Sequence, residues 1–293
     1  MTASLVQANL KHAQRVVHPL PWGDVVWHVW RAPSAAQTPF NGKQAHEGDE
    51  VRHAEPLVLL HGGSGSWTHW VKNVRHLSQT RDVWALDLPG FGDSALPPEV
   101  RDADDLVPCL RALLQHAFGQ APVDMVAFSF GGLTAGLLAA QPQHPLRRLV
   151  LVGVPGLGLM QEVLPMRGML PNMRRDQERD VHRHNLKTMM LHHAHSITEE
   201  VIDLQASNVA RDRMRRRRIA RTDVLALAQD RWHIPVHGIW GENDALYRGA
   251  MDRIASRLPK MQSLTRIPDA GHWVMFEQPD AFHAALAHVL AIP

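Results

Sequence analysis

A series of short, mostly apolar runs constrains this 293-residue chain more than any other feature of its sequence. These runs are LVLLHGG (57–63), VWALDLPG (83–90), VDMVAF (123–128), RRLVLVGV (147–154) and PVHGIWG (235–241). Their apolar residues do not alternate with polar ones, which is typical of strands buried on both faces of a parallel sheet. Stretches with helical spacing separate the earlier runs. We therefore predict an α/β fold in which helices wrap a mostly parallel central sheet.

The segments around these runs extend the pattern. Further strands are predicted at VVWHVWR (25–31) and SLTRIPD (263–269), and helices over 66–79, 102–117, 131–140 and 277–291. Between residues 32 and 55, proline, glycine and acidic residues predict a long surface loop.

The alternation of strands and helices breaks after residue 155. Residues 156–230 are rich in arginine, histidine and methionine, and they contain no convincing buried strand. We therefore predict a core made of residues 21–155 and 231–293, a helical cap inserted at 156–230, and an N-terminal extension over 1–20.

Composition excludes several classes of protein. The single cysteine, Cys109, rules out an intramolecular disulfide framework and a Cys-rich zinc site. No apolar run approaches the roughly 18 residues of a membrane helix, and the first residues lack the apolar centre of a signal peptide. A net charge of +2 is a weak field for nucleic acid. We expect a cytoplasmic protein that acts on a small molecule and binds neither nucleic acid nor membrane, with a homodimer left open.

Ser129 is the leading candidate for a catalytic nucleophile. It stands in AFSFGG, directly after the predicted strand 123–128 and before a helix of small residues. A serine on such a sharp turn projects its hydroxyl into a cleft, and the residues two before and two after it must be small. These are Ala127 and Gly131, and the helix that follows directs free backbone N–H groups at the site. The alternative is a structural serine in a glycine turn.

Asp244 and His272 are the candidate partners of this serine. Asp244 follows the predicted strand 235–241, and His272 follows the last predicted strand, so both stand at carboxyl ends of strands, where open α/β sheets bind ligands. Serine attack needs a base, and that base needs an orienting carboxylate. The order Ser, Asp, His accompanies this type of turn. Glu242 and Asp269 are rival acids, and Asp244 is preferred because it lies further into its loop.

The glycine-rich segment HGGSGSW (61–67) is the candidate oxyanion loop. Such a loop supplies a backbone N–H that works with the N–H of the residue after the nucleophile. The pair would be Gly63 and Phe130. A phosphate-binding loop is the alternative, but the segment lacks the lysine and the glycine spacing that such loops need.

Together, LLHGGSGSW, DLPGFGDS, AFSFGG and GENDAL…DAGHW resemble the α/β-hydrolase superfamily in order and spacing, over nearly the whole chain from about residue 21. The resemblance implies the α/β-hydrolase fold and a Ser-His-Asp triad, and it makes Asp87 in DLPGFGDS part of a structural turn. A serine nucleophile argues against the epoxide hydrolases and haloalkane dehalogenases of this superfamily, which use aspartate at that position.

Two further segments, GHWVMFEQPDAF and ITEEVIDLQASN (197–208), are similar to the bacterial meta-cleavage-product hydrolases, which cut a carbon–carbon bond in ring-fission dienoates. Phe128 stands where that group usually has asparagine, and Gln205 aligns with its substrate-binding arginine. Neither side chain binds a carboxylate by charge. We therefore expect a largely apolar pocket, unless an arginine of 211–221 turns inward. Substrate contacts are expected from Gly62, Ser64, Phe128, Gln205 and Trp273.

The predicted cap carries many histidines and arginines. The spacing of its histidines matches no known zinc site, so no metal is expected; they are His182, His184, His192, His193 and His195. The basic run 214–221 is predicted to be a solvated helix face.

The sequence thus predicts a serine hydrolase that cleaves a largely apolar ester or related carbonyl compound by acyl transfer, without a cofactor. Ser129 attacks, His272 takes its proton, and Asp244 orients His272. A meta-cleavage-product hydrolase, a cofactor-free perhydrolase or haloperoxidase-like enzyme, and a non-catalytic binding protein stay open as alternatives.

Overall fold

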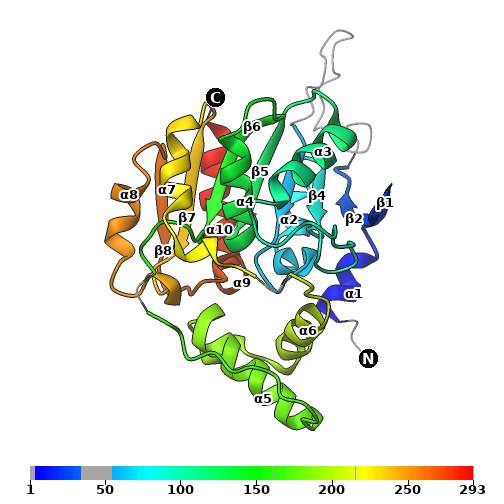
Figure 1. Ribbon diagram of the computed structural model, residues 1–293, viewed down its shortest axis with the longest axis vertical. Helices are drawn as coiled ribbons and strands as arrows, with labels where there is room; N and C mark the ends of the chain where they lie inside the picture. The colour runs from blue at the N-terminus through cyan, green and yellow to red at the C-terminus, as the bar shows by residue number, and fades with distance from the viewer. Residues whose placement is uncertain (1–3, 34–54, 161, 215, 293) are drawn as a thin grey trace, which may run out of the picture.

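The computed structural model describes residues 4–33, 55–160, 162–214 and 216–292. An eight-stranded sheet runs through the molecule in the order β1-β2-β4-β3-β5-β6-β7-β8 (Figure 1). The strands are β1 (Gln14–Leu20), β2 (Gly23–Trp30), β3 (Leu57–Leu60), β4 (Val83–Leu86), β5 (Val123–Phe128), β6 (Leu146–Val152), β7 (Val236–Gly241) and β8 (Ser263–Ile267). β2 pairs antiparallel with β1 and β4, and every other pairing is parallel, as the apolar runs predict.

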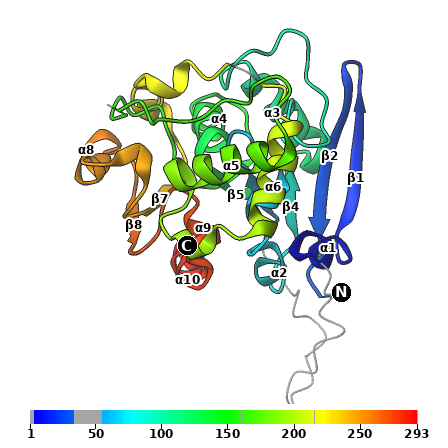
Figure 2. The same cartoon turned by 90° about the horizontal axis from the view of Figure 1, so that it is seen from below.

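Helices cover both faces of this sheet. The α-helices are α1 (Leu5–Leu10), α2 (Val74–Leu77), α3 (Leu106–Phe118), α4 (Ser129–Ala139), α5 (Arg175–Asn185), α6 (Glu199–Ala210), α7 (Val224–Ala228), α8 (Ile254–Arg257), α9 (Val274–Glu277) and α10 (Pro279–Ala291). Figures 1 and 2 show α3, α4 and α7 on one face of the sheet, with α2 and α10 on the other. Within the described residues, no helix is both long enough and apolar enough to cross a membrane.

Successive residues of the central strands pack alternately into two separate hydrophobic cores. In β3, Val58 and Leu60 pack into the core beneath α3 and α4, whereas Leu57 and Leu59 pack into the core beneath α10. This follows from the geometry of a strand, in which neighbouring side chains point to opposite faces. Apolar residues at every position are therefore needed, and this explains the uninterrupted runs in the sequence.

The observed boundaries differ from the expected ones in two places. The sheet begins at Gln14, because β1 pairs along its whole length with β2, so part of the expected extension 1–20 belongs to the sheet. The expected helix 66–79 is divided into a 3₁₀ turn, Trp67–Trp70, and the short helix α2. The expected surface loop 32–55 lies almost wholly outside the described residues.

Residues 156–230, called the inserted segment below, connect β6 to β7, and their described part contains no strand. α5 and α6 of this segment lie beyond the ends of the strands, apart from the layers that cover the two faces of the sheet (Figures 1 and 2). Buried hydrogen bonds attach the segment to the core. The Asn208 amide donates to Thr68 Oγ1 at 2.9 Å, and its carbonyl oxygen accepts from Ser66 Oγ at 2.8 Å.

Candidate active site

Three predicted side chains meet at the carboxyl ends of β5, β7 and β8. His272 Nε2 lies 2.9 Å from Ser129 Oγ, and His272 Nδ1 lies 2.8 Å from Asp244 Oδ2. Parallel strands bring their carboxyl ends to the same edge of a sheet, so residues far apart in sequence converge there. The two contacts form an unbroken hydrogen-bonded chain from the serine hydroxyl to a buried carboxylate.

The turn at Ser129 is tight and strained. Ser129 lies between the extended residue Phe128 and the rest of α4, and its φ is +49°. This is the left-handed region, which residues other than glycine usually avoid. The helix then passes close to the end of β3. A Cβ on Gly131 would lie 2.3 Å from the carbonyl oxygen of His61, so only glycine fits there. The predicted small residue two positions after the serine is therefore required by the contact between α4 and β3.

The Asp244–His272 pair is enclosed by the core. Each residue is only 2% exposed, and a Cβ on Gly153 would lie 3.2 Å from both Asp244 Oδ2 and His272 Nδ1. Asp244 Oδ1 also accepts the N–H of Leu246 at 2.9 Å, which holds the carboxylate in place. The rival acid Glu242 is exposed, so of the candidates it is Asp244 that contacts His272.

Two buried histidines support the glycine loop after β3. His61 donates from Nδ1 to the Gly62 carbonyl at 2.7 Å and accepts the Leu88 N–H on Nε2 at 3.0 Å. His69 Nδ1 accepts the Gly62 N–H at 3.1 Å. Burial lowers the pKa of His61 to about 4 and the pKa of His69 well below its usual range, so both rings are neutral at pH 7. The Gly62 N–H is therefore already hydrogen-bonded to His69. Of the two glycines, Gly63 is the one that lines the cavity.

A cavity of about 130 Å³ opens over Ser129 and His272. Its lining comes from the core and from the inserted segment: Gly63, Ser64, Phe128, Ser129, Phe130, Pro155, Met189, Met190, Arg217, Ala220 and His272. Both predicted oxyanion residues are therefore at the cavity. Phe130 stands in the first turn of α4, where backbone N–H groups have no partner within the helix.

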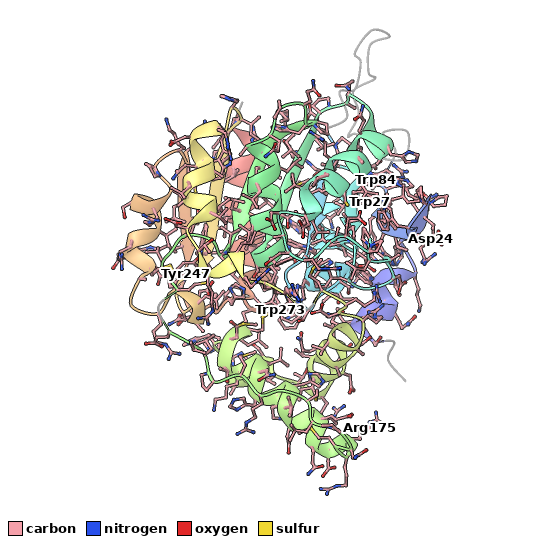
Figure 3. All side chains as sticks on the ribbon, viewed as in Figure 1. Asp24, Trp27, Trp84, Arg175, Tyr247 and Trp273 are labelled. Atoms are coloured by element: carbon pink, nitrogen blue, oxygen red, sulfur yellow. The ribbon has the colours of Figure 1, made fainter. Side chains whose placement is uncertain are left out.

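The predicted substrate contacts divide into two groups. Ser64 and Phe128 line the cavity, and the Phe128 ring lies 4.8 Å from the His272 ring. Gly62, Gln205 and Trp273 do not line it. Trp273 is fully buried, donates from Nε1 to the His69 carbonyl at 2.8 Å and stacks on a neighbouring phenylalanine, so it packs beneath the site, at the core edge nearest α5 and α6 (Figure 3).

Arg217 brings a positive charge to the cavity, which sequence analysis left only as an open alternative. Its Nη2 pairs with Asp212 Oδ2 and lies 3.4 Å from Ser64 Oγ, and its guanidinium carbon is 5.7 Å from the Phe130 ring. Its Nε is buried and has no hydrogen-bond partner among the described residues. That atom lies beside Gly63, 2.9 Å from where a Cβ would stand. Of the two alternatives left open for the stretch 211–221, an arginine that turns inward is therefore the one observed, and that arginine is Arg217.

Sequence alone does not distinguish Arg217 from the neighbouring arginines. The same run contains Arg211, which instead pairs with Asp93 at the surface, at 3.0 Å. Met189 and Met190 also line the cavity, although they are not among the predicted substrate contacts. They belong to a π-helical turn, Leu186–Met190, and such turns are frequent at functional sites but carry no signature in sequence.

Comparisons with known proteins show which family this chain matches. A family model described as "Alpha/beta hydrolase family" matches residues 57–285. Over 135 residues the chain is 33% identical to the 2-hydroxy-6-oxo-2,4-heptadienoate hydrolase of Pseudomonas putida. The aligned stretch covers 43% of this chain and 49% of that protein. Over 103 residues it is 37% identical to the dihydrolipoyllysine-residue acetyltransferase component of an acetoin cleaving system, also from Pseudomonas putida, which covers 35% of this chain and 28% of that protein.

These matches span less than half the length of the curated relatives. Among solved structures, a thermophilic esterase from Thermogutta terrifontis superposes with a TM-score of 0.63 at 21% identity, over 95% of this chain and 98% of that one. A likeness at this level of identity establishes the fold alone.

Proposed function

The chain belongs to the alpha/beta hydrolase family, and from this premise we propose that it is a serine hydrolase whose nucleophile is Ser129. The observation that carries the proposal is the hydrogen-bonded chain Ser129–His272–Asp244, which opens onto a cavity. A serine hydroxyl becomes nucleophilic when an adjacent base accepts its proton, and the base works when a carboxylate fixes its orientation.

The proposed reaction has two steps. Ser129 Oγ attacks the substrate carbonyl while His272 Nε2 takes the hydroxyl proton, and His272 then gives that proton to the leaving group. Water, activated by the same nitrogen, releases the acyl group from Ser129. Asp244 accepts the Nδ1–H of His272 throughout and stabilises the imidazolium.

The negative charge that forms on the carbonyl oxygen needs donors already in place. We assign the backbone N–H groups of Gly63 and Phe130 to this role. Both residues line the cavity next to Ser129, and the Phe130 N–H belongs to the positive end of α4. The buried Arg217 Nε, on the Gly63 side, adds positive potential to the same corner.

We also infer that the inserted segment acts as a cap. It supplies Met189, Met190, Arg217 and Ala220 to the cavity, whereas Ser129, Asp244 and His272 all come from the core. Methionine fills irregular space and adapts to varied apolar shapes. The substrate is therefore a small carbonyl compound with a mainly apolar body, and Arg217 provides a position for one anionic group.

Carbon–carbon bond hydrolysis is the second candidate, and Arg217 is the observation that favours it. A ring-fission dienoate carries a carboxylate, and a partly buried guanidinium binds such a group by charge and hydrogen bonds. One of the two Pseudomonas putida relatives is a 2-hydroxy-6-oxo-2,4-heptadienoate hydrolase, and the substrate in its name is a dienoate. Phe128, which is apolar and lies beside the nucleophile, favours the ester instead.

The test combines a covalent probe with two substrate panels. A fluorophosphonate should label Ser129, as located by peptide mass spectrometry, and labelling should disappear in Ser129→Ala. Aryl esters and ring-fission dienones are then compared by kcat/KM. Higher values for esters support the first candidate, and higher values for dienones support the second. Unlabelled Ser129 together with no turnover in either panel would refute a serine hydrolase and favour a binding protein.

A further inference from the structure

Three potential metal ligands from distant parts of the chain meet beside the loop that carries His272. His192 and His193 follow the π-helical turn of the inserted segment, and Asp269 follows β8. One ligand atom of each residue lies within 4.8 Å of the others. The histidine spacing did not predict this group, because its carboxylate stands 76 residues after His193.

A single carboxylate fastens both backbone segments of this cluster. Glu277 Oε1 accepts the N–H of His193 at 2.8 Å, and Glu277 Oε2 accepts the N–H groups of His192 at 2.9 Å and Gly271 at 2.6 Å. A Cβ on Gly271 would lie 2.8 Å from the His192 nitrogen, so glycine is what allows the segments to lie this close. The ligands thus stand on a pre-formed support.

The ring of His193 is oriented in a way that suits metal binding. Its Nε2 lies 2.9 Å from the carbonyl oxygen of Asp269 and can donate a hydrogen bond to it. Metal-binding histidines commonly donate one ring N–H to a carbonyl oxygen, which leaves the other nitrogen, here Nδ1, as the basic one. His192 and Asp269 are exposed, so their side chains can rotate toward a common centre.

We propose that His192, His193 and Asp269 bind a divalent transition-metal ion of the Zn²⁺ class. Two imidazoles and one carboxylate are ligands that Zn²⁺ accepts, and water completes the tetrahedron. Ligands in a tetrahedral zinc site are about 3.3 Å apart, given metal–ligand bonds of about 2 Å. Small rotations of the exposed His192 and Asp269 side chains would bring the ligand atoms to this distance.

The bound ion joins the inserted segment to the catalytic loop. Asp269 precedes His272 by three residues, and His192 follows the cavity residue Met190 by two. The Trp273 N–H already donates to the Met190 carbonyl at 2.8 Å. The ion therefore adds a further link between the same two segments and restrains the Met190 side of the cavity.

Isothermal titration calorimetry of the full chain with ZnCl₂ tests the site. We expect one site with a Kd on the order of 10 µM. Asp269→Asn removes the charge but suits the positive φ of +51°, because asparagine tolerates that conformation. It should weaken Zn²⁺ binding at least tenfold, as should His192→Gln. His233→Gln is the control, an exposed histidine outside this cluster, and it should leave the affinity unchanged.

Equal Zn²⁺ affinity in wild type, Asp269→Asn and His192→Gln would overturn the proposal, as would the absence of binding to the wild type. Hydrogen exchange gives a second readout that does not depend on turnover. With saturating Zn²⁺, backbone amides of 190–193 and 269–273 should exchange more slowly in the wild type but not in Asp269→Asn. Unchanged exchange in the wild type would refute the link.

Discussion

The core and the inserted segment hold their side chains by different means. Beneath the catalytic residues the core is closely packed, because a Cβ on Gly131 or Gly153 would lie within 3.2 Å of neighbouring atoms. In the inserted segment, α5 and α6 are joined by ion pairs that face solvent, with Arg179 contacting both Glu199 and Asp203. Figure 3 shows Arg175 at the end of α5 farthest from the sheet.

This difference separates two tasks. Close packing fixes the distances among Ser129, His272 and Asp244, which a reaction needs to within fractions of an ångström. The inserted segment contributes to the cavity through Met189, Met190 and Arg217. Changes in the core should therefore affect turnover and stability, whereas changes in the inserted segment should affect the choice of substrate.

Replacing the nucleophile should have the largest effect. Ser129→Ala should lower kcat by about 10⁴-fold or more, because the triad acts as a unit. Ser64→Ala is the matched control, since Ser64 has the same φ of +49° and lines the same cavity but does not contact His272. It should change kcat by less than about tenfold. Similar losses in the two purified, folded variants would contradict the assignment.

Filling glycine positions compares the packing of the two regions directly. A Cβ on Gly132 would lie 2.1 Å from Val154 Cγ1 and 2.7 Å from the Ala127 carbonyl oxygen, so Gly132→Ala should lower the free energy of unfolding by about 1–3 kcal/mol. Gly168, in the inserted segment, has nothing within 4 Å of its Cβ position. Gly168→Ala should leave that free energy unchanged or slightly raised. Urea unfolding measures the free energy of unfolding of both variants. An equal decrease in the two variants would contradict the difference in packing between the core and the inserted segment.

Acid should weaken the core through its buried neutral histidines. His61 has a pKa of about 4 in the folded protein, against 6.5 for an unperturbed histidine. The unfolded chain therefore binds the proton first, and stability that is full above pH 6.5 is lost as the pH falls toward 4. His61 alone should cost about 2 kcal/mol between pH 7.5 and pH 5. Urea unfolding of His61→Gln should show a smaller difference between these pH values than the wild type, and an unchanged difference would refute this role.

Arg217 tests whether the inserted segment selects substrates. Arg217→Met keeps an unbranched, flexible stem and removes the charged guanidinium. Asp212 keeps the Ser64 hydroxyl at 2.7 Å and the Met214 N–H at 2.9 Å as donors. The variant should lose about tenfold in kcat/KM for an ester with an ω-carboxylate, relative to its neutral analogue. Arg211→Met, at the surface pair with Asp93, is the control and should not change this ratio. A ratio unaffected by Arg217→Met would leave the cavity without an anion-binding role.

The same contrast explains what the sequence could and could not predict. The strands and the convergence of Ser129, Asp244 and His272 follow from local patterns, because two-sided burial and the tight turn each leave a mark in the chain. No local pattern distinguishes Arg217 from Arg211. Their environments depend on how the inserted segment lies against the core, through contacts such as Asn208 with Thr68, which join residues 140 positions apart.

The smallest effect on stability is expected when the ion pairs that face solvent are removed. Arg179→Gln removes the contacts with Glu199 and Asp203, whose side chains are 68% and 57% exposed. Water therefore already solvates both carboxylates, and side-chain ordering offsets the attraction. The urea midpoint should barely change, and any change should shrink in 1 M salt, where charges are screened within about 3 Å. The matched core variant is Arg148→Gln, since Arg148 is 2% exposed and donates to the Leu290 carbonyl at 3.0 Å. Its loss leaves the partly buried carbonyl oxygens of Leu290 and Ile292 without this donor, and the midpoint should fall clearly at any salt concentration. If instead Arg179→Gln were as damaging as Arg148→Gln, the inserted segment would be held as firmly as the core, and its proposed adaptability to substrates would be wrong.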